Sequence, residues 1–164
     1  MSGRESIIEI VEADLALAEH QRAVVELLDA YSRDVMGNRR PLADDVRERL
    51  VPALRDQPQT LILLAYDGER HVGIAVCFGG FSTFAARPLL NVHDLAVIAE
   101  YRGRRIGRRL LEAVEQHARA TGCCKVTLEV LEGNPARRLY DSMGYSAPTY
   151  DNDAGRALFL AKRL

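Results

Sequence analysis

The segment that most constrains the fold is a glycine-containing turn between a strand pattern and a helix pattern. Residues 93–97 read His-Asp-Leu-Ala-Val, residues 101–108 hold two glycines among four arginines, and residues 106–120 have amphipathic helical spacing. The first N–H groups of a helix lack intrahelical partners and lie at the positive end of its dipole. Gly103 and Gly107 have no Cβ, so a ligand can approach the backbone closely. This order of elements predicts an anion site for a pyrophosphate, with cationic help from the arginines.

Two familiar phosphate-binding motifs do not fit this turn. A P-loop closes with Gly-Lys-Ser/Thr, and a dinucleotide fingerprint needs three glycines in a strand–helix–strand unit. Residues 102–107 instead resemble the acyl-CoA pyrophosphate loop of the GCN5-related N-acetyltransferase (GNAT) family, whose pattern is Arg/Gln-x-x-Gly-x-Gly/Ala. Arg105 stands where that pattern has its middle glycine. An arginine is expected to resist a positive φ, and its guanidinium adds a candidate phosphate contact.

A second block, later in the chain, strengthens the resemblance. A strand pattern at 128–130 is followed by Asn134, by a short helical pattern that contains Tyr140, and by Gly144 and Tyr145. The same order of strand, asparagine, tyrosine-bearing helix, glycine and aromatic strand start occurs in the GNAT family. The two blocks have the order and separation of the family's motifs, so the chain is identified as a member of this family.

Apolar periodicity predicts an α/β or α+β fold in one domain, residues 1–164. Strands are expected at 6–11, 61–66, 71–78, 88–97, 125–131, 145–150 and 156–162, the last two as a hairpin, and helices at 43–55, 106–120, 135–142 and from a cap at Asp14 to residue 34. On the helix at 106–120, the core-facing residues are expected to be Leu110, Leu111, Val114 and Ala118. The resemblance implies the GNAT-like α/β acyl-CoA N-acyltransferase fold, whose mixed, mostly antiparallel central sheet is flanked by helices and holds acyl-CoA where two central strands splay apart.

The resemblance also implies which residues hold acetyl-CoA as the acetyl donor. Backbone groups of the strand before the loop bind the pantetheine and the thioester carbonyl, the loop binds the pyrophosphate, and the asparagine binds the pantetheine or caps its helix. The cofactor-binding residues are accordingly Leu95, Ala96, Val97, Arg102, Gly103, Arg104, Arg105, Ile106, Gly107 and Asn134. No metal is expected.

Tyr140 falls at the family's tyrosine, which lies near the sulfur of the donor and serves as general acid. A phenol with a pKa of about 10 is protonated at neutral pH and can protonate a departing thiolate. The alternative is that Tyr140 is only a core aromatic on a short helix.

His93 is the candidate base, since an imidazole titrates near neutrality. Strand alternation predicts that His93 shares a face with Asn91, Leu95 and Val97, whereas Asp94 points to the opposite face. A histidine on a strand can equally be a structural group with its hydrogen bonds satisfied.

Residues 81–97 resemble the diamine acetyltransferase branch of the family, which has an aromatic-Ser-Thr-aromatic stretch followed by Leu-Glu-Asp-Leu-x-Val. His93 takes the place of the glutamate associated with the base role and amine binding, and Asp94 matches the aspartate. Tyr31 matches an amine-binding tyrosine, but Ser32 replaces the acidic residue beside it. Loss of two carboxylates argues against a strict polyamine substrate and leaves a small primary amine, an amino acid derivative or a diamine.

Composition and sequence pattern limit the partners and the cellular location expected for the protein. The net charge of −1 favours neither a nucleic acid nor a membrane partner. No segment is apolar over the ~18–20 residues of a membrane span, and no signal-peptide pattern begins the chain, so a cytoplasmic protein is expected. The three cysteines, two of them adjacent, form no disulfide framework and are interpreted as free thiols. Many relatives are dimers, and a homodimer is expected by resemblance.

These features together predict an N-acetyltransferase that uses acetyl-CoA and acts on a small amine by direct attack in a ternary complex. Two alternatives stay open at this point. One is a protein or peptide acetyltransferase, and the other is a non-catalytic acyl-CoA-binding module that retains the loop.

Overall fold

The computed structural model describes residues 7–148, 155 and 157–164. Internal contacts divide the chain into two compact units, Met1–Glu129 and Val130–Leu164. The larger unit contains the sheet and the helices α1 to α3, and the smaller unit contains the short helix α4 (Arg137–Ser142). Each unit is described by itself.

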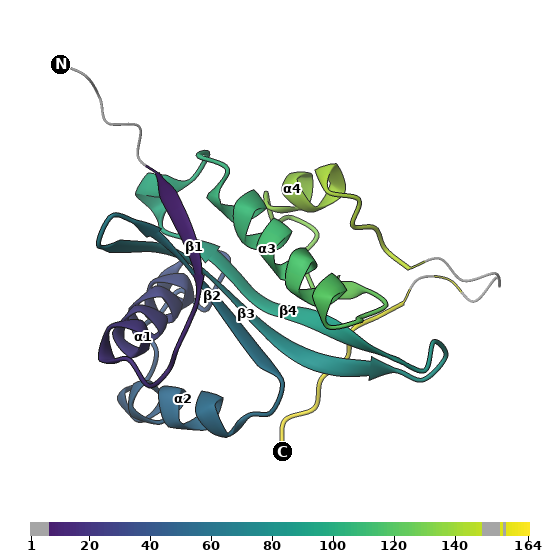
Figure 1. Ribbon diagram of the computed structural model, residues 1–164, viewed down its shortest axis with the longest axis horizontal. Coiled ribbons are helices and arrows are strands. Elements are labelled where there is room, and N and C mark those ends of the chain that lie inside the picture. Colours follow the sequence, from purple (N-terminus) through teal and green to yellow (C-terminus); the bar gives the residue numbers. More distant parts are fainter. Residues whose placement is uncertain (1–6, 149–154, 156) are drawn as a thin grey trace. The chain divides into compact units, whose positions relative to one another are not determined.

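Within the described residues, one sheet has the strand order β1-β2-β3-β4-β5. The strands are β1 (Ile8–Glu12), β2 (Thr60–Asp67), β3 (Arg70–Ser82), β4 (Arg87–Val97) and β5 (Val126–Leu128). Neighbours from β1 to β4 pair antiparallel, whereas β5 joins β4 in parallel. The sheet is therefore mixed and mostly antiparallel, which confirms the predicted α/β class (Figure 1).

Helices cover both faces of this sheet. The helices α1 (Ala18–Arg33) and α2 (Asp44–Asp56) lie on one face, and α3 (Ile106–Ala120) lies on the other (Figure 1). Two consecutive residues of β3 face opposite sides of the sheet, one toward each layer of helices. Ile74 belongs to the core cluster that includes residues of α1 and α2, whereas a Cβ on Gly73 would meet Leu110 and Ile106 of α3 at 3.2 and 3.3 Å.

The apolar stripe of α3 explains why this helix forms where the sequence predicts it. Its buried residues are Ile106, Leu110, Leu111, Val114 and Ala118, spaced at three and four residues as one helical face requires. Gly122, with φ of 75°, adopts the left-handed conformation that commonly ends a helix. The predicted bounds 106–120 and the four predicted core positions are confirmed.

Most other predicted elements are confirmed within one to four residues, and three details are wrong. The helix α1 begins at Ala18, with Leu17 as its N-cap residue. Asp14 does not cap this helix, since its side chain accepts a hydrogen bond from the Ala16 N–H at 2.8 Å, before the helix starts. The strand β5 covers only three of the seven residues predicted. A 3-10 turn, η1 (Ala99–Tyr101), precedes the loop and was not predicted.

The predicted terminal hairpin is the largest departure. Residues 149–154 and 156 lie outside the described residues, and the described parts of both predicted strands, 145–148 and 157–162, are not strands. The apolar run Leu158, Phe159 and Leu160 remains largely exposed. An apolar run forms a strand only when a neighbouring edge takes its backbone hydrogen bonds, and no such pairing exists among the described residues.

Candidate active site

The loop between β4 and α3 has the backbone conformation of a glycine-rich turn. Gly103 has φ of 77°, and a Cβ there would meet nothing within 4 Å, so the space above it is open. Arg105 precedes the first residue of α3 with φ of 62° and ψ of 13°. The arginine thus adopts the left-handed conformation that it was expected to resist. Such a conformation costs roughly 1–2 kcal/mol for a residue with a Cβ, and the surrounding turn must supply that free energy.

The neighbouring side chains hold the start of the loop. Tyr101 donates a hydrogen bond to Asp67 Oδ2 at 2.7 Å, which fastens η1 to the β2–β3 hairpin. The guanidinium of Arg104 lies over the Tyr101 ring, 4.5 Å from its centroid. Arg70 pairs with Glu100 at 3.1 Å from the same hairpin. These contacts fix η1 and leave the polar end of the loop, with Arg104 and Gly103, exposed to solvent.

Arg102 connects the loop to the end of α1. Its terminal nitrogen lies 2.7 Å from Asp34 Oδ2, and its Nε donates to the Val97 carbonyl at 3.0 Å. Asp34 also accepts a hydrogen bond from the Met36 N–H. That backbone bond, together with Arg102, holds the pKa of Asp34 below its ordinary value. The guanidinium predicted to bind the pyrophosphate is therefore engaged within the protein.

Among the described strands, none pairs with the outer edge of the last part of β4, beside this loop. Its parallel pairing with β5 begins at Leu90 and ends with Val92 opposite Leu128, although β4 continues to Val97. Among the described residues no strand lies against the outer edge of residues 93–97. The backbone of Leu95, Ala96 and Val97 thus lies where two strands stop pairing, as the resemblance implied.

A β-bulge changes the predicted orientation of His93. Val76 of β3 lies opposite Asp94 and Cys77 lies opposite Val92, so His93 is an extra residue on β4. His93 Nδ1 lies 3.1 Å from Asp94 Oδ2, and the two side chains are on the same side of the strand. The prediction that they point to opposite faces is wrong, because the extra residue interrupts the two-residue alternation.

The face that carries His93 and Asp94 is the one covered by α1. The His93 ring meets Phe78 edge-on, with centroids 5.4 Å apart and planes at 79°. Phe78 packs against the core cluster that contains Val24 and Leu27 of α1, as does Ala96, which follows Asp94 by two residues. The bulge therefore puts an imidazole and a carboxylate on the face of β4 that packs against α1, the helix whose C-terminal end carries Tyr31.

Tyr31 lies at that end of α1 and is half-buried. Burial raises the pKa of Tyr31, and the charges of Asp94 and Asp34 raise it further. Two carboxylates thus act on one phenol, although the sequence suggested that the acidic residue beside this tyrosine is lost. Ser32, which replaces it, is buried and donates to the Arg40 carbonyl at 2.8 Å, so its role here is structural.

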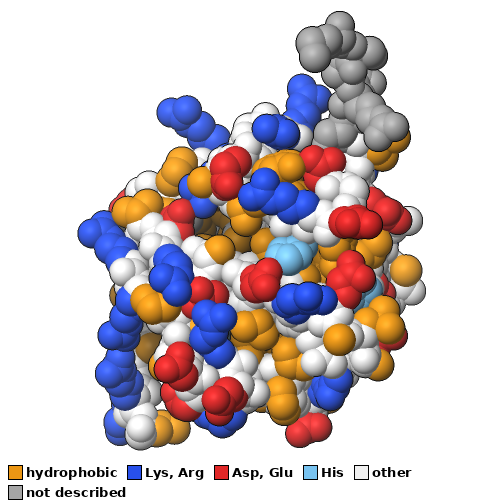
Figure 2. All heavy atoms as spheres, turned by 90° about the vertical axis from the view of Figure 1, so that its left-hand side faces the viewer, with side chains coloured by type: hydrophobic (Ala, Val, Ile, Leu, Met, Phe, Trp, Pro, Cys, Tyr) orange, Lys and Arg blue, Asp and Glu red, His pale blue; other side chains and the backbone are white. Residues whose placement is uncertain are grey.

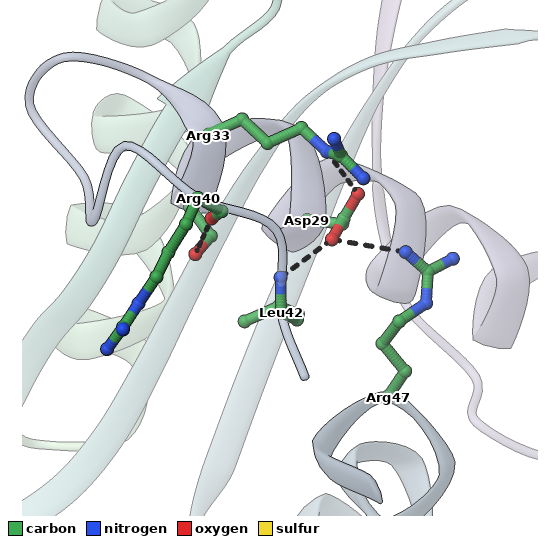
Figure 3. A network of polar contacts seen from close by, with 6 residues as sticks. Asp29, Arg33, Arg40, Leu42 and Arg47 are labelled. Atoms are coloured by element: carbon green, nitrogen blue, oxygen red, sulfur yellow. Dashed lines mark hydrogen bonds and ion pairs between the residues drawn. The ribbon is translucent and has the colours of Figure 1, made fainter. Parts of the chain in front are cut away.

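A buried carboxylate holds the connection between α1 and α2 in place. Asp29 accepts hydrogen bonds from the Leu42 N–H at 2.9 Å and from Arg33 at 2.8 Å, and Arg47 lies 3.1 Å from it (Figure 3). Burial alone would raise the pKa of Asp29, but these hydrogen bonds and the two positive charges outweigh it and hold the pKa below its ordinary value. The segment after Tyr31 is therefore fastened to α1.

In the smaller unit, Asn134 and Tyr140 have separate local roles. Asn134 Oδ1 accepts a hydrogen bond from the Ala136 N–H at 2.9 Å, which closes a turn just before α4, and α4 itself has Ala136 as its N-cap without a side-chain cap. Tyr140 is buried on α4 and meets Tyr145 at an inclined angle, with centroids 6.1 Å apart. The residues of the motif thus form a turn at Asn134 followed by the short helix that carries Tyr140.

Sequence reasoning missed Asp34 and Phe78, because a contact over many residues leaves no local pattern. Cys77 is a buried free thiol, and burial, aided by the charge of Asp94, raises its pKa to about 12. The adjacent Cys123 and Cys124 are free and only partly buried.

Neither a metal cluster nor a membrane helix is found in the described part of the chain. No group of three or more His, Cys, Asp or Glu residues is arranged to hold a metal ion there. The helices of that part are also too short or too polar to cross a membrane. Over most of the face in Figure 2, basic and acidic side chains are interspersed.

Comparison with known proteins identifies the family. The model of the acetyltransferase (GNAT) family matches residues 23–145. Over 103 residues, 62% of this chain and 69% of the other, the chain is 28% identical to the uncharacterized N-acetyltransferase YhfO of Bacillus subtilis (strain 168).

Solved structures share the fold. The aminoglycoside acetyltransferase meta-AAC0020 from an uncultured soil metagenomic sample matches with a TM-score of 0.72 and 20% identity, over 96% of this chain and 99% of that one. The ribosomal-protein-alanine N-acetyltransferase of Brucella melitensis biovar Abortus 2308 matches with a TM-score of 0.69 and 17% identity, over 93% and 100%. The homologues indicate an N-acetyltransferase, and the chain belongs to the GNAT family of acetyltransferases.

Proposed function

We propose that this enzyme transfers an acetyl group from acetyl-CoA to a primary amine of a small molecule, by direct attack in a ternary complex. The observation that carries the proposal is the bulge in β4. It puts His93 and Asp94 on the face of β4 that α1 covers, where the charge of Asp94 acts on Tyr31 and where β4 has just lost its parallel partner. An imidazole base beside a carboxylate, with a phenol whose pKa that carboxylate raises, suits an ammonium group that must be deprotonated.

The loop supports acetyl-CoA as the donor. The space above Gly103 is open, and Arg104 and Arg105 are exposed around the first turn of α3. Unpaired N–H groups of a helix start and guanidinium groups are the donors that a pyrophosphate prefers. Arg102 contributes indirectly in this proposal, because Asp34 and the Val97 carbonyl already engage it. In this proposal, the backbone of Leu95, Ala96 and Val97, beyond the last residue of β4 that pairs with β5, binds the pantetheine and the thioester carbonyl.

The chemistry follows from these roles. His93 removes one proton from the acceptor ammonium, directly or through a water molecule. The neutral amine then attacks the thioester carbon, its C–N bond forms, and the C–S bond breaks to release a thiolate. Tyr140 is the proposed acid that protonates this thiolate, on the strength of the motif alone. The remaining amine proton passes to solvent, so no covalent enzyme intermediate is needed.

The acceptor is proposed to be a small amine because the carboxylates near Tyr31 are few. Asp94 and Asp34 both influence this phenol, but Arg102 neutralises Asp34. Few carboxylates are thus left near Tyr31 to bind the additional ammonium groups of a polyamine. The solved structures do not decide the matter, since one is named an aminoglycoside acetyltransferase and the other a ribosomal-protein-alanine N-acetyltransferase. We also propose that the enzyme is a homodimer and that it is located in the cytoplasm.

A thiol-release assay tests the proposal. The enzyme is incubated with acetyl-CoA and a panel of diamines, amino acids, aminoglycosides and a lysine peptide, and free CoA is measured. A strong signal with a small amine is expected, and it should fall in His93→Ala and Tyr140→Phe while the affinity for acetyl-CoA, measured by calorimetry, stays unchanged. A signal with the peptide alone would support a protein acetyltransferase. Tight donor binding with no turnover on any amine would contradict the enzyme and favour an acyl-CoA-binding module.

A further inference from the structure

The bulge in β4 places a carboxylate against one particular nitrogen of His93. We propose that Asp94 is a positioning residue that holds His93 as the tautomer with its proton on Nδ1, which leaves the lone pair of Nε2 free to accept the proton of the amine. The inference rests on the proposed role of His93 as base. It adds the residue that determines which imidazole nitrogen accepts the proton of the amine.

The geometry supports this assignment. His93 Nδ1 lies 3.1 Å from Asp94 Oδ2, within hydrogen-bond distance. An ionised carboxylate only accepts hydrogen bonds, so a neutral imidazole must place its proton on Nδ1 to make this contact. The Phe78 ring meets the imidazole edge-on and restricts its plane from a second direction. Nε2, on the far side of the ring, is left as the acceptor.

The difference in exposure fits the two roles. The side chain of His93 is 61% exposed, whereas that of Asp94 is 26% exposed. The base is therefore accessible to a substrate or a water molecule, and the carboxylate that orients it lies deeper. Without the bulge the two residues would point to opposite faces of β4 and could not form this contact. The extra residue in β4 is therefore what allows the side chains of His93 and Asp94 to contact each other.

Two other histidines provide internal comparisons, because their contacts select the opposite tautomer. His20 Nδ1 accepts a hydrogen bond from the Asp14 N–H at 2.8 Å, so its proton must lie on Nε2. His71 Nε2 lies 2.7 Å from Glu26 Oε2, which also places a proton on Nε2. Among these three, only His93 is predicted to carry its proton on Nδ1.

The competing interpretation is that Asp94 binds the ammonium of the acceptor directly. Its charge acts on Tyr31, which lies in the proposed acceptor site. The two roles differ in what they depend on. A positioning residue acts only through His93, whereas a direct ligand contributes to binding whether or not the imidazole is present.

The first test is a ¹⁵N NMR measurement of the histidine tautomers in the full chain, at a pH about two units above the ordinary histidine pKa of ~6.5. In the wild type, His93 should show a protonated Nδ1 and a bare Nε2, whereas His20 and His71 show the reverse. Asp94→Ala should shift His93 toward the Nε2-protonated form and leave the other two unchanged. Asp94→Asn, which keeps a carbonyl oxygen, should shift it less. A wild-type His93 protonated on Nε2, or a tautomer unaffected by Asp94→Ala, would overturn the proposal.

The second test is a kinetic double-mutant cycle with an amine that the thiol-release panel identifies. Asp94→Ala should lower kcat by about 10-fold or more with little change in KM, because a base must be held in reach of its proton. In a His93→Ala background the same substitution should change kcat by less than roughly twofold. An equal loss in both backgrounds, or a loss mainly in KM, would show that Asp94 binds the acceptor. If no amine reacts, the proposed function fails, and the NMR result still decides whether Asp94 positions His93.

Discussion

Because Arg105 has a left-handed backbone conformation, we predict that the protein is more stable with glycine than with alanine at this position. A side chain at φ of 62° costs roughly 1–2 kcal/mol relative to glycine. Glycine in turn gains conformational entropy in the unfolded chain, worth about 0.4–1 kcal/mol. We therefore expect Arg105→Gly to be more stable than Arg105→Ala by about 0.5–1 kcal/mol, or ~1–4 °C in Tm for a chain of this length. Both variants lack the guanidinium, so their difference isolates the backbone.

Arg104 supplies the matched control, because it is the neighbouring arginine and is not among the residues with positive φ. There the order should reverse, with Arg104→Gly less stable than Arg104→Ala by about 0.4–1 kcal/mol. Urea unfolding followed by far-ultraviolet circular dichroism measures both differences. If glycine is no better than alanine at position 105, or if the two positions behave alike, the argument from backbone strain is refuted.

Two further predictions concern buried charge and a buried thiol. Asp29→Asn should lower the free energy of unfolding by about 1–3 kcal/mol, because the charge-assisted hydrogen bonds to the carboxylate are weakened or lost, while the exposed guanidinium groups of Arg33 and Arg47 remain solvated. Since the pKa of Asp29 is lowered in the fold, its contribution is complete above its unfolded pKa of ~3.9 and is lost as the pH falls through the folded value. Urea unfolding of the wild type should therefore weaken more steeply with acid than that of the variant, and parallel curves would contradict this account. Cys77, with a pKa of about 12, should resist iodoacetamide at pH 8 while the two other thiols react, as mass spectrometry of the native protein can check. Labelling of all three at similar rates would mean that the thiol is not buried in solution.

Local periodicity was enough to predict the elements that build the fold. The helix α3 matches its predicted bounds because its apolar spacing, its entry turn and the closing Gly122 all agree. The β2–β3 hairpin could be predicted for the same reason. The strand β5 was predicted too long because its apolar run says nothing about where β4 stops pairing with it.

The candidate site was predictable only where a motif carries it. The loop and its arginines could be found from sequence, but the orientation of His93 could not, since one extra residue in a strand leaves the apolar pattern almost unchanged. Asp34 was missed because its contact with Arg102 joins residues far apart in the chain. The positive φ of Arg105 shows that a turn can impose a conformation against local preference.

The ion pair between Arg102 and Asp34 has a consequence for how two ligands would affect each other. It ties the turn that would hold the donor to the helix end that carries Tyr31. A donor that orders the turn would therefore lower the entropic cost of ordering the acceptor side, and linkage requires that the acceptor return the same free energy to the donor. In this chain, one charged contact would therefore make the affinities for the two substrates depend on each other.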